Sequence, residues 1–181
     1  MTDVYRIGVK VFCTKGKEID LEELIPVFHR WIQQKRTSHM LIDVADYSHV
    51  PSGPGILLVA NEGNYTLDDR GGRRGLTFYR KRELGGSLDE RLLAVARDAV
   101  AAARMLAAEP ELAGRLEFSG AELTAYFNDR LHAPNTEECF AAVKAPVVGF
   151  FERALGAGAK LTRADDPRER LTVTARAAAA S

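Results

Sequence analysis

The segment 128–132 combines an amide, a guanidinium and an imidazole directly before a predicted helix that begins at Asn135. The N-terminus of a helix offers free N–H groups and positive potential, so cations placed beside it favour a phosphate or carboxylate ligand. Two lysines occupy the loop after Phe12, which corresponds to this segment if the strand-loop-helix pattern occurs twice along the chain. The predicted ligand-binding residues are therefore Asn128, Arg130, His132, Lys15 and Lys17. A purely local role is the alternative, because Asp129 could pair with Arg130.

Carboxylates and an imidazole elsewhere could support metal-dependent hydrolase or lyase chemistry, since both groups are ligands of divalent metals. Asp46 and His49 would converge if the chain turns after Tyr47, which makes them weak candidate metal ligands, although no metal site is predicted. Glu62 could act as a general base, but Gly63 beside it also suits a simple turn or bulge. The candidate catalytic residues are Asp46, His49, Glu62 and Asp129, with no role and no cofactor assigned.

Asp43 stands among the apolar residues Leu41, Ile42 and Val44 in a predicted strand. We interpret that strand as interior, where an unpaired carboxylate would cost several kcal/mol. We therefore expect a side chain or amide from another element to pair with Asp43. If the partner is structural, Asp43→Asn should destabilise the fold by roughly 1 to 3 kcal/mol. If Asp43 is functional, the same change should spare stability and remove ligand binding.

A basic segment surrounds two aromatic residues, Phe78 and Tyr79. Its cations are Arg70, Arg73, Arg74, Arg80, Lys81 and Arg82. Cations beside aromatic rings can contact phosphates and stack on bases, so the Arg70–Arg82 hairpin supports an alternative role in nucleic-acid binding or as a scaffold. A solvated hairpin is the favoured interpretation. Lys plus Arg and Asp plus Glu number 25 each, so no whole-molecule field attracts nucleic acid, and we do not expect it as a partner.

The sequence lacks the strong motifs of nucleotide, metal and nucleophile sites, namely GxGxxG after a strand, GxxxxGK[ST], HExxH, GxSxG and CxxC. Cys13 and Cys139 are the only cysteines, and we expect both to be reduced packing residues. The motifs therefore neither establish nor exclude an enzyme.

Apolar periodicity and capping patterns predict the elements that must position these groups. Strands are predicted at residues 4–12, 41–48, 56–60, 64–67, 76–80 and 116–127, with a final strand at 160–163 or 171–175. Helices are predicted after the capping boxes at residues 20–23 and 87–90 and after Asn135. Pro26 should kink the first helix or restart it. The turn residues between the short strands favour antiparallel pairing.

A strand, a loop and a proline-containing helix occur twice along the chain. Phe12 precedes the cap Asp20 by eight residues, and Phe127 precedes Asn135 by the same number. If this β-loop-α pseudo-repeat is real, both loops leave the sheet along related edges and the helix starts lie together as a concave ligand site. A chance match is the alternative.

Length and composition indicate a single globular domain, and the predicted elements indicate its class. A chain of 181 residues with 46% hydrophobic and 28% charged residues is typical of one globular domain with its own core. We predict a single α+β domain over residues 1–176, followed by a frayed tail at 177–181. It should contain a mixed or largely antiparallel sheet of five to seven strands, with three main helices packed mainly on one face.

The predicted function follows from these features taken together. No apolar run approaches the length of about 18 residues that a membrane span needs, and the first residues lack a secretory pattern, so we expect a cytoplasmic protein with no membrane partner. The preferred function is binding of a small anionic or phosphate-bearing metabolite. A metal-dependent enzyme and a nucleic-acid-binding or scaffold protein are the alternatives, and a homo-oligomer is left open.

Overall fold

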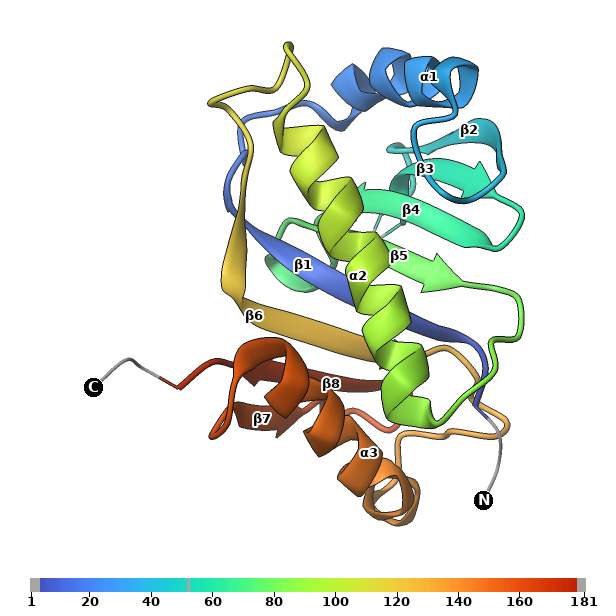
Figure 1. The fold of residues 1–181 in the computed structure, drawn as a ribbon, viewed down its shortest axis with the longest axis vertical. Helices are drawn as coiled ribbons and strands as arrows, with labels where there is room; N and C mark the ends of the chain where they lie inside the picture. The colour runs from blue at the N-terminus through green and yellow to red at the C-terminus, as the bar shows by residue number, and fades with distance from the viewer. Residues whose placement is uncertain (1–3, 52, 179–181) are drawn as a thin grey trace.

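The computed structural model, which describes residues 4–51 and 53–178, contains one antiparallel sheet of eight strands with three α-helices on one of its faces (Figure 1). The strands are β1 (Ile7–Lys15), β2 (Leu41–Tyr47), β3 (Gly55–Ala60), β4 (Gly63–Asp68), β5 (Gly75–Arg80), β6 (Glu117–Phe127), β7 (Lys160–Arg163) and β8 (Leu171–Arg176). The α-helices are α1 (Leu24–Gln34), α2 (Leu88–Ala107) and α3 (Glu137–Leu155), and the short 3-10 helices are η1 (Leu21–Glu23) and η2 (Arg70–Gly72). The order across the sheet is β2-β3-β4-β5-β1-β6-β8-β7.

The predicted α+β class is confirmed, and each pair of neighbouring strands is antiparallel. The sheet has eight strands and not the expected five to seven, because both alternatives for the final strand are present, as β7 and β8. These two strands pair with each other, and β8 also pairs with β6. The extra strand therefore extends the sheet beyond β8 and forms one of its edges.

The two faces of the sheet differ in what covers them. Ile7, Val9 and Val11 of β1 lie in the core beneath α2, which crosses β1 and β5 (Figure 1). Successive side chains of a strand point to opposite faces, so Lys10 and Phe12 point away from the helices. We call this second side, which none of the described α-helices covers, the open face.

The first two helices begin where the sequence predicts. Asp20 and Ser87 form capping boxes with Glu23 and Glu90. The first cap opens η1, and α1 follows directly, so that Pro26 lies in the first turn of α1. The first turn of a helix has no hydrogen-bond acceptors for its N–H groups, so the missing N–H of Pro26 costs nothing there. Of the two expectations, the structure therefore shows a new helix start near Pro26 and not a kink inside a longer helix.

The third helix begins one residue later than predicted, because Thr136 caps α3 in place of Asn135. The Thr136 hydroxyl accepts a hydrogen bond of 3.2 Å from the amide of Cys139. Asn135 is buried, and its side-chain amide donates to the carbonyls of Ala164 at 2.8 Å and Asp166 at 2.9 Å. Asn135 therefore fixes the connection between β7 and β8 to the start of α3.

The strand-loop-helix succession occurs twice, as β1-α1 and β6-α3, but the two units run in opposite directions. β1 and β6 are antiparallel neighbours, with Ile7 opposite Phe127. Their loops therefore leave the sheet at opposite ends, and α1 and α3 lie at opposite ends of the molecule (Figure 1). The expectation that both loops share an edge and that the helix starts form one concave site is wrong.

The interpretation of β2 as an interior strand is also wrong, because β2 is an edge strand that pairs only with β3 among the described strands. Asp43 is exposed, and its carboxylate accepts a hydrogen bond of 2.8 Å from the amide of the next residue, Val44. No described element supplies the partner that the burial argument required. An exposed carboxylate remains hydrated, so it needs none.

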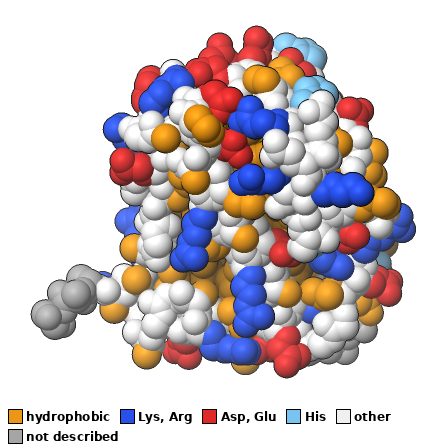
Figure 2. Space-filling view, turned by 45° about the horizontal axis from the view of Figure 1, so that its top comes forward, with side chains coloured by type: hydrophobic (Ala, Val, Ile, Leu, Met, Phe, Trp, Pro, Cys, Tyr) orange, Lys and Arg blue, Asp and Glu red, His pale blue; other side chains and the backbone are white. Residues whose placement is uncertain are grey.

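The surface carries charges of both signs. Figure 2 shows acidic and basic side chains intermixed on the face in view, in keeping with a net charge of zero. None of the helices in the described ranges has both the length and the apolarity that crossing a bilayer requires. Of the tail predicted at 177–181, residues 179–181 lie outside the described residues.

Candidate functional site

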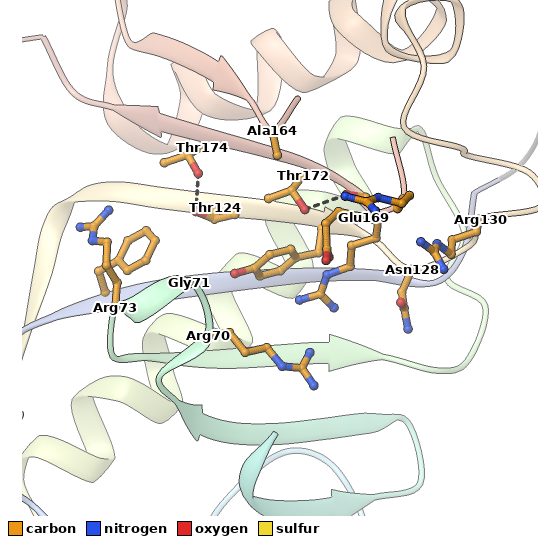
Figure 3. A pocket seen from close by; sticks show the side chains of 14 residues that line it. Arg70, Gly71, Arg73, Thr124, Asn128, Arg130, Ala164, Glu169, Thr172 and Thr174 are labelled. Carbon is orange, nitrogen blue, oxygen red and sulfur yellow. Dashed lines mark hydrogen bonds between the residues drawn. The ribbon is translucent and has the colours of Figure 1, made fainter. Parts of the chain in front are cut away.

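A hollow of about 800 Å³ lies on the open face, where five arginines from three separate segments meet (Figure 3). Its floor is formed by the sheet, and one wall by η2, which connects β4 to β5. The other wall consists of the chain after β6 and the connection between β7 and β8. The five arginines are Arg70, Arg73, Arg130, Arg168 and Arg170. We call this hollow the arginine pocket.

The floor of the pocket is polar because alternate residues of β6 and β8 face it. Thr124 lies opposite Thr174, and Tyr126 opposite Thr172, in the antiparallel register of these strands. The hydroxyls of Thr124 and Thr174 are 2.7 Å apart and share a hydrogen bond. The residues between them, such as Ala125 and Val173, belong to the core on the other side.

A buried ion pair holds the η2 wall in place. The ammonium of Lys10 lies 2.7 Å from Asp68 Oδ1, and both side chains are almost completely buried. Lys10 also donates to the carbonyl of Arg70 at 3.3 Å, while Asp68 accepts from the Arg70 amide at 3.0 Å. Burial lowers the pKa of Lys10, against the opposing effect of the Asp68 charge. Gly75 leaves room for this pair, since a Cβ there would lie 2.6 Å from Lys10 Cε.

Arg170 packs flat against the floor. Its guanidinium carbon lies 3.9 Å from the centre of the Tyr126 ring. Burial lowers the pKa of Arg170, and the positive charge of Arg70 acts in the same direction. The two cations therefore repel each other across the pocket.

Three of the five arginines have no carboxylate within ion-pair distance among the described residues, although the charge of Asp166 acts on Arg130 and that of Asp68 acts on Arg170. Among the described residues, no acidic side chain forms an ion pair with Arg70, Arg130 or Arg170. Glu169 also lines the pocket. Its carboxylate is exposed and forms no ion pair with a described cation. Asn128 and Arg130 project beside one another at the same end (Figure 3).

The other two arginines are already paired. Arg73 donates two hydrogen bonds to Glu122, at 2.7 and 2.8 Å, and stacks on Phe12 at 3.9 Å from the ring centre. The hydrogen bonds from Arg73 lower the pKa of Glu122. Arg168 pairs with Asp166 at 3.2 Å. Positive charge is therefore concentrated away from the Arg73 end of the pocket.

The predicted ligand-binding residues fall into two groups. Asn128 and Arg130 line the arginine pocket, and the Asn128 amide donates to the Tyr79 hydroxyl at 2.7 Å. His132 does not line it, because its ring nitrogen bonds Asp129 at 2.9 Å. Asp129 thus pairs with the histidine and not with Arg130.

Lys15 and Lys17 lie elsewhere, beside a second hollow of about 740 Å³ that also includes Cys13 and Arg74. Lys15 is the last residue of β1 and Lys17 follows it, whereas Asn128 and Arg130 follow β6, and the antiparallel pairing places those strand ends apart. Lys15 donates to the carbonyl of Gly114, and burial raises the pKa of the Cys13 thiol to about 12, which disfavours the reactive thiolate. The five predicted residues therefore do not form one site.

The candidate catalytic residues do not form one group, although Asp46 and His49 lie close enough that the charge of His49 contributes to lowering the pKa of Asp46, after the hydrogen bonds from Ser48. Asp46 accepts hydrogen bonds from the amide and hydroxyl of Ser48, at 2.8 and 2.6 Å, at one end of β2. Glu62 accepts from the amide of Met40 at 3.1 Å, at the other end of β2. Asp129 follows β6, which lies five positions from β2 in the order of strands across the sheet. Within the described ranges, no three His, Cys, Asp or Glu side chains are grouped so that they could hold a metal ion.

The basic hairpin predicted as one patch is divided by β5. Arg70 and Arg73 face the arginine pocket before β5 begins, while residues 80–82 lie at the opposite end of this strand. Arg74 forms an ion pair with Asp69 at 2.9 Å and donates hydrogen bonds to backbone carbonyls of the loop after β1. The hairpin therefore offers no continuous row of free cations.

Sequence reasoning missed most of the pocket. The residues that it did not single out are Lys10, Asp68, Thr124, Tyr126, Arg168, Arg170 and Thr174. The alternation of threonine with apolar residues in segments 123–127 and 171–175 is the available signal, since it predicts strands with one polar face. It does not show that those polar faces are adjacent.

Comparison with known proteins adds no function. The chain matches no protein-family model, no curated protein and no solved structure.

Proposed function

We propose that this protein binds a small anionic metabolite in the arginine pocket. The observation that carries the proposal is the convergence of Arg70, Arg130 and Arg170 on one hollow, where none of the three forms an ion pair with a carboxylate of the described residues. Guanidinium groups bind carboxylates and phosphates through paired, charge-assisted hydrogen bonds. A bound anion would replace the missing carboxylates.

The repulsion between Arg70 and Arg170 gives a second reason. Their charges act on each other, and the lowered pKa of Arg170 reflects burial first and this repulsion in addition. An anion between the two groups would attract both of them and so offset the repulsion. Both groups are held ready for it, since Lys10 and Asp68 fix the backbone of Arg70 and the Tyr126 ring supports Arg170.

The test is calorimetric titration with inorganic phosphate and with citrate at constant ionic strength. We expect saturable binding of at least one of these anions to the parent protein. Arg170→Gln should weaken it by at least about tenfold, because a charge-assisted hydrogen bond is worth about 1.5 to 3 kcal/mol. Arg104→Gln is the matched control, since Arg104 is an exposed cation on α2, across the sheet from the pocket.

Two results would overturn the proposal. One is the absence of saturable binding of both anions to the parent protein. The other is an equal loss of affinity in Arg170→Gln and Arg104→Gln, which would reduce the effect to net charge.

A further inference from the structure

Charge and hydroxyl groups are separated along the arginine pocket. Figure 3 shows Thr124 and Thr174 lying between Arg73 at one end and Asn128 and Arg130 at the other. The charge of Arg73 is neutralised by Glu122. A ligand that fills the pocket therefore meets cations at one end and neutral hydroxyls beyond them.

The hydroxyl region can exchange hydrogen bonds with a ligand. The single bond between Thr124 and Thr174 uses one hydroxyl proton, so the other hydroxyl of the pair keeps its proton for a further acceptor. Thr172 donates to the carbonyl of Arg170 at 3.0 Å and keeps its lone pairs. The Glu169 carboxylate, which Figure 3 shows beside the Thr172 side chain, is an acceptor for ligand O–H groups.

The aromatic rings of the pocket are not available for stacking a nucleobase. A guanidinium covers Tyr126 at 3.9 Å, and another covers Phe12 at the same distance. Both rings are also buried, with exposed fractions of 6% for Phe12 and 8% for Tyr126. Recognition of the ligand body therefore depends on hydrogen bonds.

We propose that the ligand is a phosphate monoester of a hydroxylated compound, such as a sugar or polyol phosphate. This inference rests on the proposed function. Three guanidinium groups match a phosphate dianion with three terminal oxygens better than a single carboxylate. The pocket volume of about 800 Å³ lies within the range of sites for whole small molecules and exceeds the needs of a bare anion. Thr174 and Glu169 then bind the hydroxyls of the body.

The experiment compares three probes by calorimetric titration at constant ionic strength: inorganic phosphate, propyl phosphate and ribose 5-phosphate. Propyl phosphate carries the phosphate group without the hydroxyls. We expect ribose 5-phosphate to bind about tenfold or more tightly than propyl phosphate, which corresponds to one or two additional hydrogen bonds. Equal affinities of these two esters would overturn the inference and leave the proposed function standing. Failure of all three probes to bind would also overturn the inference, and it would overturn the proposed function itself if citrate does not bind either.

Two variants locate the effect. Thr174→Val removes the hydroxyl at nearly constant volume and should reduce the preference for ribose 5-phosphate several-fold without changing the affinity for inorganic phosphate. Thr162→Val is the control, because Thr162 lies opposite Thr174 on β7 but does not line the pocket. A preference that is unchanged in both Thr174→Val and Glu169→Ala would overturn the inference.

Discussion

Lys10 is a fully buried cation on the strand β1, on the side of the sheet that faces away from the α-helices. Its ammonium is stabilised by the carboxylate of Asp68 and by two backbone carbonyls. Such a pair contributes little net stability against an apolar alternative, but removing one partner leaves a buried charge uncompensated. Its contribution here is to fix the backbone of Arg70, a residue of the proposed site.

Lys10→Met should therefore destabilise the fold by about 3 to 5 kcal/mol, because Asp68 is left buried without its cation. Urea unfolding at neutral pH measures this difference. Asp68→Asn in the same background should recover part of the loss, since it removes the uncompensated charge. A loss below about 1 kcal/mol in Lys10→Met, within the range of ordinary surface changes, would show that the pair is not buried in solution.

Glu122 links stability to pH. Hydrogen bonds from Arg73 hold the pKa of Glu122 below its ordinary value, so the ionised pair stabilises the fold above that ordinary value. This stabilisation is lost as the pH falls through the lowered pKa. Glu122→Gln should cost up to about 1 kcal/mol near neutral pH, and the difference from the parent should shrink between about pH 5 and pH 3. Unfolding free energies that differ equally at both pH values would contradict this assignment.

At the scale of elements, the position of a strand in the sheet decides what its residues need. The apolar run of β2 predicts a strand correctly, but local pattern does not distinguish an edge strand from an interior one. The helices and their caps, in contrast, depend on neighbours in sequence, and two of the three predicted caps are found where expected. Asn135 is the exception, because contacts with the distant residues 164 and 166 replace the capping role.

The edge position of β2 changes the expectation for Asp43. Asp43→Asn should alter the free energy of unfolding by no more than about 0.5 kcal/mol, because the side chain is exposed and bonds only the adjacent amide among described groups. Thermal and urea unfolding of the variant beside the parent test this. A loss of 1 kcal/mol or more, on the order of a spoiled buried polar pair, would restore the burial interpretation.

Glu109 ties α1 to the segment that follows α2. It is 6% exposed and accepts hydrogen bonds of 2.6 Å from the indole N–H of Trp31 and from Arg30. Glu109→Ala should cost about 2 to 4 kcal/mol, because the buried Trp31 N–H loses its acceptor and two charge-assisted bonds are lost. Glu111→Ala is the control, since this exposed carboxylate also bonds Arg30 but should cost much less stability than Glu109→Ala. Equal costs in urea unfolding would contradict the assignment.

At the scale of the whole molecule, the pocket lies where two segments of the chain join. Residues 7–80 supply β1 to β5, residues 117–176 supply β6 to β8, and the antiparallel pair of β1 and β6 joins them. Arg70 comes from the first segment and Arg130 and Arg170 from the second. The proposed site therefore exists only when both segments have assembled into one sheet.

This arrangement explains how far sequence reasoning reached. Strand and helix positions follow from periodicity, and the residue types in the loop after Phe127 predict an anion site at Asn128 and Arg130, which line the arginine pocket. Strand order does not follow from local pattern, so the meeting of Arg130 with Arg70 and Arg170 could not be predicted. The expectation that both loops of the pseudo-repeat leave the sheet along related edges placed Lys15 and Lys17 beside Asn128 and Arg130, and it was wrong for the same reason.

The central claim is that one anion contacts Arg70, Arg130 and Arg170 together. Nuclear magnetic resonance of the arginine Nε–Hε groups during titration with inorganic phosphate measures this for each residue. We predict that the signals of these three arginines shift together and saturate with a single dissociation constant, while those of Arg97 and Arg104, exposed on α2, stay in place. The account would be contradicted if the signals of the three pocket arginines do not move, or if they move no more than those of Arg97 and Arg104.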